Sequence, residues 1–194
     1  YDHYTSAENS FPVTVSDPVM YGKIQLTKYA LNTVSGDKQA EEGATFTVYL
    51  KSAGSYDAAK ETERDIITIG KDGKGTSKSL PYGTYCVQQR TGWAGYDRDE
   101  TVYEVRISKD GQTVTKDNFG HDLTIYNNIW TGKLSILKVD GADNTPLSGA
   151  VFTLTGSDGS ESKLTTGEDG TVTFENLVFG VTYVWKETKA PKSY

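Results

Sequence analysis

The sequence predicts an all-β chain built from two tandem antiparallel β-sandwiches, and three observations support this fold class. The chain repeats itself internally, each repeated block alternates apolar and polar residues, and the composition favours strands. Its 194 residues include 20 Gly and 13 Tyr but one Met, and no sustained helical period of apolar residues is present. Many short strands separated by glycine-containing turns are typical of antiparallel sandwiches.

Four blocks of sequence occur twice in the same order, which is the pattern of a repeated structural module. We therefore expect two copies of one domain, the first over residues 21–130 and the second over residues 131–194. The connection between them, residues 127–132, is short and leaves little freedom for a hinge. The matched blocks are residues 22–28 with 132–138, 43–48 with 149–154, 70–73 with 167–170, and 83–89 with 181–187.

Within each block, apolar residues recur at every second position, as expected for a strand with one buried face. Glycine-containing turns lie between the blocks, and the turn at residues 109–111 predicts a hairpin among the closing strands of the first domain. Residues 53–65 are the one place for a short helix or a long loop. The inward positions of the first strand are Ile24, Leu26 and Lys28 in the first copy and Leu134, Ile136 and Lys138 in the second.

Residues 1–20 match the end of the first domain and not its beginning. Val15 and Asp17 take the places of Ile125 and Asn127. We therefore expect residues 1–20 to be the closing strand of an adjoining domain, and the second domain to lack its own closing strand. Two explanations stay open. Either the chain is one period of an array whose units complete each other, in one polypeptide or by strand donation between copies, or it was trimmed inside a domain.

Composition and charge argue against nucleic-acid binding, an intrachain disulfide and a membrane span. The net charge is -6 and the basic residues are scattered, which gives no electrostatic footprint for nucleic acid. Cys86 is the only cysteine, so an intrachain disulfide is impossible. No apolar run is long enough to span a bilayer, so we expect no membrane insertion in this segment.

A lysine at the inward end of an apolar strand face is unusual, because lysine is almost never fully buried unless it is paired. One explanation is that Lys28 and Lys138 lie where the strand ends fray and the ammonium reaches solvent. The other is a polar cluster inside the sandwich. Glu187 shares a strand face with Tyr183, and Asn127 follows apolar residues on an inward face, so these groups would meet the lysines in the core.

The repeated motifs resemble those of the Cna protein B-type, or SpaA-like, domains of Gram-positive pilins and adhesins. The resemblance covers nearly all of residues 21–194. It implies Ig-like or prealbumin-like sandwiches in an extracellular, cell wall-attached surface structure. The motifs that carry it are residues 132–140 (GKLSILKVD), 146–152 (PLSGAVF), 165–170 (TTGEDG) and 183–191 (YVWKETKAP).

The resemblance also implies an autocatalytic Lys–Asn/Asp isopeptide bond in each core. Lys28 would join Asn127, and Lys138 would join Asp17 of a neighbouring copy. The assisting acid of the family, a proton shuttle, corresponds to Glu187. In the first domain this position is Gln89, which does not exchange a proton readily. Two alternatives stay open there: another acid enters the site and Lys28 reacts, or the core is hydrogen-bonded without a cross-link.

The chemistry suits these residue types. A desolvated lysine is a neutral amine and therefore a nucleophile, and a protonated carboxyl group polarises the amide carbonyl and moves protons. Asparagine would release ammonia and aspartate would release water. The product is an amide that constrains the unfolded chain as a disulfide does.

Other chemistry-bearing residues have simpler explanations. Cys86 could belong to an internal thioester, but its strand is explained by the repeat, and we expect a half-exposed cysteine. Aspartate-rich turns such as residues 167–170 lack the ligand spacing of a calcium loop, and His3 and His121 are isolated. We therefore expect no metal and no cofactor. The three tryptophans, Trp93, Trp130 and Trp185, are expected to pack at strand ends and at the joint, the alternative being a carbohydrate-binding surface.

Two functions follow from these expectations. The first is a structural stalk or fibre segment, whose partner is a further copy or an adjoining repeat, arranged head to tail. The alternative is an adhesin module that binds a host surface protein or a glycan, with residues 53–65 as its platform. No residue pattern supports an enzyme that turns over a substrate.

Overall fold

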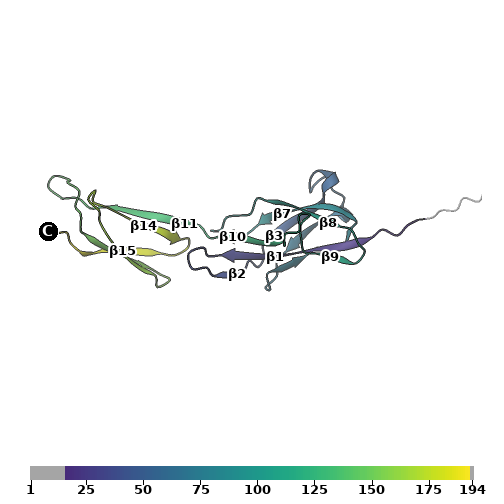
Figure 1. Cartoon of the computed structure of the whole chain (residues 1–194), viewed down its shortest axis with the longest axis horizontal. Helices are drawn as coiled ribbons and strands as arrows, with labels where there is room; N and C mark the ends of the chain where they lie inside the picture. The colour runs from purple at the N-terminus through teal and green to yellow at the C-terminus, as the bar shows by residue number, and fades with distance from the viewer. Residues whose placement is uncertain (1–15, 193–194) are drawn as a thin grey trace, which may run out of the picture.

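The computed structural model describes residues 16–192, and these residues form four β-sheets. Strands β1–β10 enclose one hydrophobic core and strands β11–β15 enclose a second. We call these two groups of strands the first and the second module. Figure 1 shows them end to end along the long axis of the molecule. The predicted all-β fold of two tandem sandwiches is confirmed.

The first module packs a six-stranded sheet against a four-stranded one. The six-stranded sheet is centred on β1 (Tyr21–Leu31), which pairs with β2 (Lys38–Ala40), β5 (Lys74–Thr76), β6 (Leu80–Pro81), β9 (Gln112–Val114) and β10 (Thr124–Asn128). Strands β9 and β10 run parallel to β1. The other sheet has the order β4 (Arg64–Thr68), β3 (Thr45–Leu50), β7 (Gly83–Thr91), β8 (Val102–Ile107).

The hairpin expected at residues 109–111 is wrong, because β8 and β9 belong to different sheets. Strand β8 pairs with β7, and β9 pairs with β1. The turn carries the chain across the sandwich, and the side chain of Gln112 holds it by accepting hydrogen bonds from the backbone N–H groups of Ser108 and Lys109 at 3.0 and 3.2 Å. Each sheet gains a closing strand in this way.

In the segment 53–65, residues 54–60 form a loop between two 3-10 turns, η1 (Lys51–Ala53) and η2 (Glu61–Glu63), and β4 begins at Arg64. Arg64 closes this loop, since its guanidinium donates to the carbonyl oxygens of Tyr56 and Asp57 and lies over the Tyr56 ring at 5.1 Å. No helix among residues 16–192 has the length and apolar character needed to cross a lipid bilayer.

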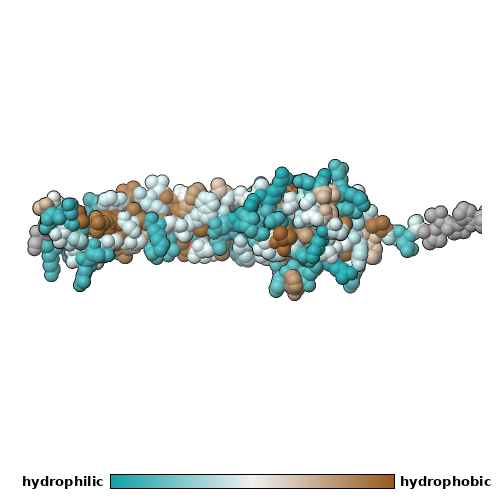
Figure 2. All heavy atoms as spheres, turned by 90° about the horizontal axis from the view of Figure 1, so that it is seen from above, coloured by the Kyte–Doolittle hydropathy of each residue, from teal (hydrophilic) through white to brown (hydrophobic). Residues whose placement is uncertain are grey.

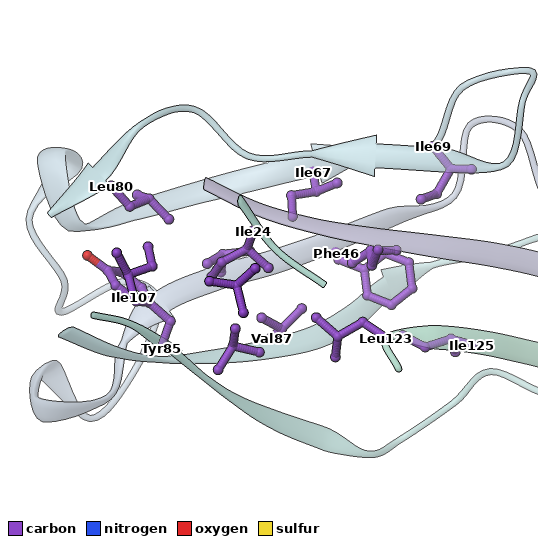
Figure 3. Packing of buried hydrophobic residues seen from close by; sticks show 14 of the residues in the cluster. Ile24, Phe46, Ile67, Ile69, Leu80, Tyr85, Val87, Ile107, Leu123 and Ile125 are labelled. Atoms are coloured by element: carbon purple, nitrogen blue, oxygen red, sulfur yellow. The ribbon is translucent and has the colours of Figure 1, made fainter. Parts of the chain in front are cut away.

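The core of the first module lies between its two sheets, where the labelled side chains of Figure 3 point toward one another. Alternation places Ile24 and Leu26 of β1 on the inward face, opposite Phe46 of β3 and Val87 of β7, and all four are fully buried. Each buried aliphatic side chain contributes about 1.5–3 kcal/mol. The next inward position of β1 after Leu26 is Lys28, so the core continues directly into the candidate site.

The second module is built on the same plan with fewer strands. Strand β11 (Thr131–Leu137) pairs with β14 (Thr171–Val178), and a three-stranded sheet has the order β13 (Glu161–Thr165), β12 (Val151–Gly156), β15 (Tyr183–Lys189). Within residues 16–192, no strand takes the place that β10 has beside β1 or that β8 has beside β7. As a result Leu134 and Ile136 are only half-buried, and hydrophobic residues reach the surface of this half of the molecule (Figure 2).

Two residues join the modules, since β10 ends at Asn128 and β11 begins at Thr131. The backbone N–H of Trp130 donates to the carbonyl of Gly95 at 2.7 Å, and its carbonyl accepts from Phe179 N–H at 2.9 Å. The two aromatic rings meet edge to face at 5.5 Å. A methyl group on Gly95 would lie 2.0 Å from the Phe179 ring, so glycine is required for this close fit.

Candidate cross-linking site

The first candidate residue, Lys28, lies on the inward face of β1 with 0% of its side chain exposed. Its ammonium does not reach solvent at the strand end. Burial lowers the pKa of Lys28, although the nearby Glu41 carboxylate opposes this shift. The side chain is therefore shifted toward the neutral amine, the form that acts as a nucleophile.

The partner of Lys28 is Glu41, a residue that the sequence comparison missed. Strand β2 runs antiparallel to β1, and Glu41 follows its last residue with its N–H donating to the Lys28 carbonyl at 3.2 Å. Lys28 Nζ lies 3.0 Å from Glu41 Oε2, and the Glu41 side chain is also 0% exposed. This is a fully buried ion pair, which in proteins requires further hydrogen bonds to be tolerated.

Asn127 supplies one of those hydrogen bonds. It lies on β10, whose parallel register places it opposite Ala30 of β1, and only 1% of it is exposed. Its Nδ2 donates to Glu41 Oε1 at 3.3 Å. The Glu41 carboxylate therefore bridges an amine and a carboxamide, the two groups that form an amide when ammonia leaves.

The loop after β7 covers this cluster. The backbone N–H of Trp93 donates to Glu41 Oε1 at 2.6 Å. The loop approaches so closely at Gly92 that a methyl group there would lie 2.6 Å from Glu41 Oε1 and 3.0 Å from Asn127 Nδ2. The backbone of this loop covers the site, and the side chains of Lys28 and Glu41 are not exposed to solvent.

Gln89, the residue at the family's acid position, is buried but does not contact Lys28 through a hydrogen bond. Its Oε1 accepts from Asp99 N–H at 3.1 Å, and its Nε2 donates to the Thr91 carbonyl at 3.2 Å. The carboxylate beside Lys28 belongs instead to Glu41, the residue after β2.

The repeat itself contained a signal for this acid. Glu41 N–H donates to the Lys28 carbonyl, and Leu147 N–H donates to the Lys138 carbonyl in the same way, so Glu41 and Leu147 are equivalent. Gln89 pairs with Phe46 as Glu187 pairs with Phe152. The acid therefore lies at a different position in each module. The first module has Glu41 and Gln89 where the second has Leu147 and Glu187.

In the second module, Lys138 and Glu187 meet but remain accessible to solvent. Lys138 Nζ donates to Glu187 Oε2 at 3.0 Å, and each side chain is 29% exposed. The other carboxylate oxygen, Glu187 Oε1, is buried and has no hydrogen-bond partner among residues 16–192. In the first module the corresponding oxygen, Glu41 Oε1, accepts hydrogen bonds from Asn127 Nδ2 and from the backbone N–H of Trp93.

Asp17, expected to react with Lys138 of a neighbouring copy, is exposed on the segment that precedes β1. This segment and the second module lie at opposite ends of the molecule (Figure 1), so Asp17 does not reach Lys138 within one chain. Residues 16–20 form no strand, and residues 1–15 of the expected closing strand lie outside the described residues.

Cys86 is buried, so the expectation of a half-exposed cysteine is wrong. It lies on β7, a strand with partners on both sides, between Tyr49 of β3 and Glu104 of β8. Lys51 forms an ion pair with Glu104 at 2.6 Å next to it. Cys86 therefore lies between neighbouring strands with long side chains on both sides, which the alternation pattern did not anticipate.

The residues considered for metal binding serve as turn elements. Within residues 16–192, no three His, Cys, Asp or Glu side chains are grouped so that they could hold a metal ion. His121 Nδ1 lies 3.0 Å from Asp117, and the Asp169 side chain accepts from the backbone N–H of Thr171 at 2.9 Å. His3 lies outside the described residues.

The tryptophans differ in exposure. Trp93 is half-buried, and its indole N–H donates to the Glu42 carbonyl at 2.9 Å. Trp130 lies at the joint as expected but is 48% exposed, and Trp185 is 51% exposed on β15. The Trp185 ring also packs edge to face on Phe152 at 5.8 Å.

Comparison with known proteins agrees with this architecture. The model of the SpaA prealbumin-like fold domain matches residues 22–119 and 132–194. The structure of the Bacillus anthracis TIE protein is similar over 90% of this chain, with 30% identity and a TM-score of 0.69, and the chain spans 29% of that protein. A C-terminal fragment of the pilus adhesin SpaC from Lactobacillus rhamnosus GG is similar over 91% of this chain and 78% of its own length, with 23% identity and a TM-score of 0.51.

No curated protein sequence matches the chain. Because the family model covers both modules, including the strands that carry Lys28, Glu41, Lys138 and Glu187, the assignment rests on most of the sequence. The chain belongs to the family of SpaA-type prealbumin-like fold domains.

Proposed function

We propose that this chain is a structural segment of a bacterial surface stalk or fibre, and that its first module is locked by an isopeptide bond between Lys28 and Asn127. The observation that carries this proposal is the buried contact of Lys28, Glu41 and Asn127, each at most 1% exposed. Membership of a family whose relatives include a pilus adhesin supports an extracellular, cell wall-attached location.

The reaction begins with a proton transfer. Lys28 Nζ and Glu41 Oε2 are 3.0 Å apart, so a proton moves from the ammonium to the carboxylate and leaves a neutral amine beside a carboxylic acid. Burial favours this neutral pair over two desolvated charges. Glu41 then serves as the proton shuttle, a role that general acid–base catalysis makes worth about 10²–10⁴-fold in rate.

In the next step the Lys28 amine attacks the carboxamide carbon of Asn127. The new C–N bond forms while the carbonyl electron pair moves to Oδ1. Glu41 gives its proton to Nδ2, which lies 3.3 Å from its Oε1, and takes one from Nζ. The C–Nδ2 bond breaks, ammonia leaves, and the products are an amide and a neutral Glu41 carboxyl group. The event occurs once per molecule and involves no turnover.

The position of the proposed bond would allow the first module to resist a pulling force. Lys28 lies on the first strand of the module and Asn127 on the last, and these strands are neighbours in one sheet. A pulling force that enters at β1 and leaves through the joint after β10 would pass through the cross-link without unzipping the strands between. A cross-link that closes a loop of about 100 residues stabilises a fold by about 4.7 kcal/mol in the chain-entropy treatment.

For the second module, we propose that Lys138 bonds Asp17 of a neighbouring copy, with Glu187 as the shuttle and water as the leaving group. Three observations support this. The β11 edge has no closing strand within the described residues, Glu187 Oε1 is buried without a donor, and Asp17 matches Asn127 in the repeat. Copies would then follow one another head to tail.

The first test is the intact mass of the denatured chain. We expect a mass lower than the sequence mass by one ammonia, and a full mass for Lys28→Ala. Lys23→Ala is the matched control, since Lys23 is an exposed residue of the same strand and should leave the loss unchanged. A wild-type mass equal to the sequence mass would contradict the Lys28–Asn127 bond.

The head-to-tail bond is tested with a synthetic peptide of residues 1–20 and an Asp17→Ala chain, which cannot react with itself through this residue. We expect the chain to gain the mass of the peptide minus one water. A peptide carrying Asp17→Ala, and a chain carrying Lys138→Ala, should each give no adduct. Equal adduct formation without Asp17 or without Lys138 would contradict the proposal.

The exposure of Trp185 favours a second candidate function, binding of a host surface protein or a glycan. Trp185 and its neighbour Val184 are 51% and 67% exposed on β15, and exposed aromatic rings stack on apolar faces of ligands. Glycan or host-protein binding that is lost in Trp185→Ala, with unchanged unfolding, would establish this alternative.

A further inference from the structure

In the proposed reaction, negative charge develops on Asn127 Oδ1 when the amine attacks. In enzymes that form tetrahedral intermediates, preorganised N–H donors stabilise such an oxygen, and they are most effective where water is excluded. The first module contains a donor in this position. The backbone N–H of Asp99 donates to Asn127 Oδ1 at 3.2 Å.

The donor is fixed in place by the side chain of its own residue. Asp99 Oδ1 accepts from Thr101 N–H at 2.9 Å, and Asp99 Oδ2 accepts from the Tyr103 hydroxyl at 2.6 Å. Burial alone would raise the pKa of Asp99, but the hydrogen bonds from Tyr103 and Thr101 lower it overall. Asp99 thus stays a carboxylate that anchors the loop, while its N–H points into the site.

The same loop donates hydrogen bonds to both the acid and the carboxamide. At its start, Trp93 N–H donates to Glu41 Oε1, and at its end, Asp99 N–H donates to the carboxamide oxygen. Gly92 allows the backbone to lie against both groups, because any side chain there would strike Glu41, Gln89 and Asn127. The carboxamide of Asn127 is held at its oxygen by the Asp99 N–H and at its nitrogen by Glu41, which fixes its orientation.

We infer that the loop over residues 92–99 is a catalytic element of the cross-linking reaction, and that the N–H of Asp99 is its oxyanion hole. This inference rests on the proposed Lys28–Asn127 bond. Gln89 Oε1 shares the same N–H at 3.1 Å, so the hydrogen bond is bifurcated before reaction. As negative charge grows on Asn127 Oδ1, the N–H shifts toward it, because a charged acceptor forms the stronger hydrogen bond.

The test removes this N–H and keeps the side chain of residue 99. Cell-free synthesis of the full chain with the α-hydroxy analogue of aspartate at position 99 replaces the amide by an ester. Samples quenched in denaturant at intervals give the fraction that has lost ammonia. We expect bond formation to be slower by about 10²–10³-fold, the usual effect of removing one oxyanion-hole donor.

The matched control is the same ester substitution at Asp97. Its N–H belongs to the same loop and donates to the Asn128 carbonyl at 2.8 Å, outside the reacting groups, so this chain should form the bond at close to the wild-type rate. Equal rates for the two ester chains would overturn the inference while leaving the bond itself intact. Absence of ammonia loss in the wild-type chain would overturn the proposed function instead.

A second measurement does not require the ester chain to fold. In Lys28→Met/Gln89→Ala the carboxamide of Asn127 stays unreacted, and Gln89 no longer competes for the Asp99 N–H. The amide proton of Asp99 should therefore exchange with solvent more slowly in this variant than in Lys28→Met/Gln89→Ala/Asn127→Ala. Equal exchange in the two variants would show that Asp99 does not donate to Asn127, and would also overturn the inference.

Discussion

Lys28 and Lys138 occupy equivalent places on β1 and β11, yet solvent reaches only the second. The first pair, Lys28 and Glu41, is 0% exposed, and the second pair, Lys138 and Glu187, is 29% exposed. The distance between nitrogen and oxygen is 3.0 Å in both. The two modules therefore differ in enclosure and not in the contact between amine and acid.

The enclosure comes from the strands and the loop that follow β7. In the first module β10 lies beside β1, and the loop over residues 92–99 covers the ion pair with backbone N–H groups. In the second module, no described residues take these places. A buried ion pair that makes no further hydrogen bonds is energetically unfavourable. In the second module the Lys138–Glu187 pair stays partly exposed to solvent.

The two modules also differ in which strand carries the acid. The first has Glu41 and Gln89 where the second has Leu147 and Glu187. Either arrangement brings a carboxylate to 3.0 Å from the lysine. The proposed reaction therefore requires a carboxyl group at this place beside the lysine, and either of two positions in the module can supply it.

The largest effect is expected from Glu41→Gln. This change keeps the size of the side chain and an oxygen that accepts from Trp93 N–H, but it removes the proton shuttle, so loss of ammonia should slow by about 10²–10⁴-fold. Glu187→Gln should leave it unchanged. Intact mass against time after synthesis measures both. Equal rates for Glu41→Gln and the wild-type chain would show that Glu41 is not the shuttle.

The next comparison concerns stability. Asn127→Ala prevents the bond in the first module, and we expect its free energy of unfolding to fall by about 5 kcal/mol, the entropic effect of cross-linking a loop of about 100 residues. Lys138→Met in the half-exposed pair should cost under about 1 kcal/mol in an isolated chain. Chemical denaturation of the two variants measures the difference. Similar losses would mean that enclosure and cross-linking do not distinguish the modules.

The position of the acid is tested by moving it, in the first module, from position 41 to position 89, which corresponds to Glu187 in the second module. Glu41→Leu alone should lose cross-linking, and Glu41→Leu/Gln89→Glu should regain part of the 10²–10⁴-fold contribution of the shuttle, about 10-fold or more. The readout is again loss of ammonia. If the double variant reacts no faster than Glu41→Leu, the two acid positions are not interchangeable.

The sequence predicted the sandwiches, the inward lysines and Asn127, because period-two alternation and an internal repeat report directly on which residues share a buried face. Glu41 was missed because it lies outside any alternating block, after a strand of three residues. The Asp99 donor is a backbone group, and side-chain patterns carry no information about it. The crossing of residues 108–111 between the sheets depends on which strand edges are free, which only the three-dimensional arrangement shows.

The smallest expected effect is a dependence of stability on pH in a chain that cannot form the bond. In Asn127→Ala, Lys28 stays a free lysine, and the groups facing it are Glu41 and Asp99. Burial lowers the pKa of Lys28 below its ordinary 10.5, so between the folded value and 10.5 the unfolded chain binds more protons than the folded one. Stability rises with pH wherever the unfolded state binds more protons.

Raising the pH toward 10.5 should therefore relieve the cost of burying Lys28. The reference is Lys28→Met/Asn127→Ala, in which the amine is absent while Tyr85 and Tyr103, whose pKa values burial raises to about 12, are retained. Their titration cancels in the difference. The gap in unfolding free energy between the two variants should shift in favour of Asn127→Ala as the pH rises, as measured by chemical denaturation. A gap that stays constant up to the ordinary pKa of lysine would mean that the Glu41 carboxylate fully offsets the desolvation of Lys28, and that the amine is not held ready to react.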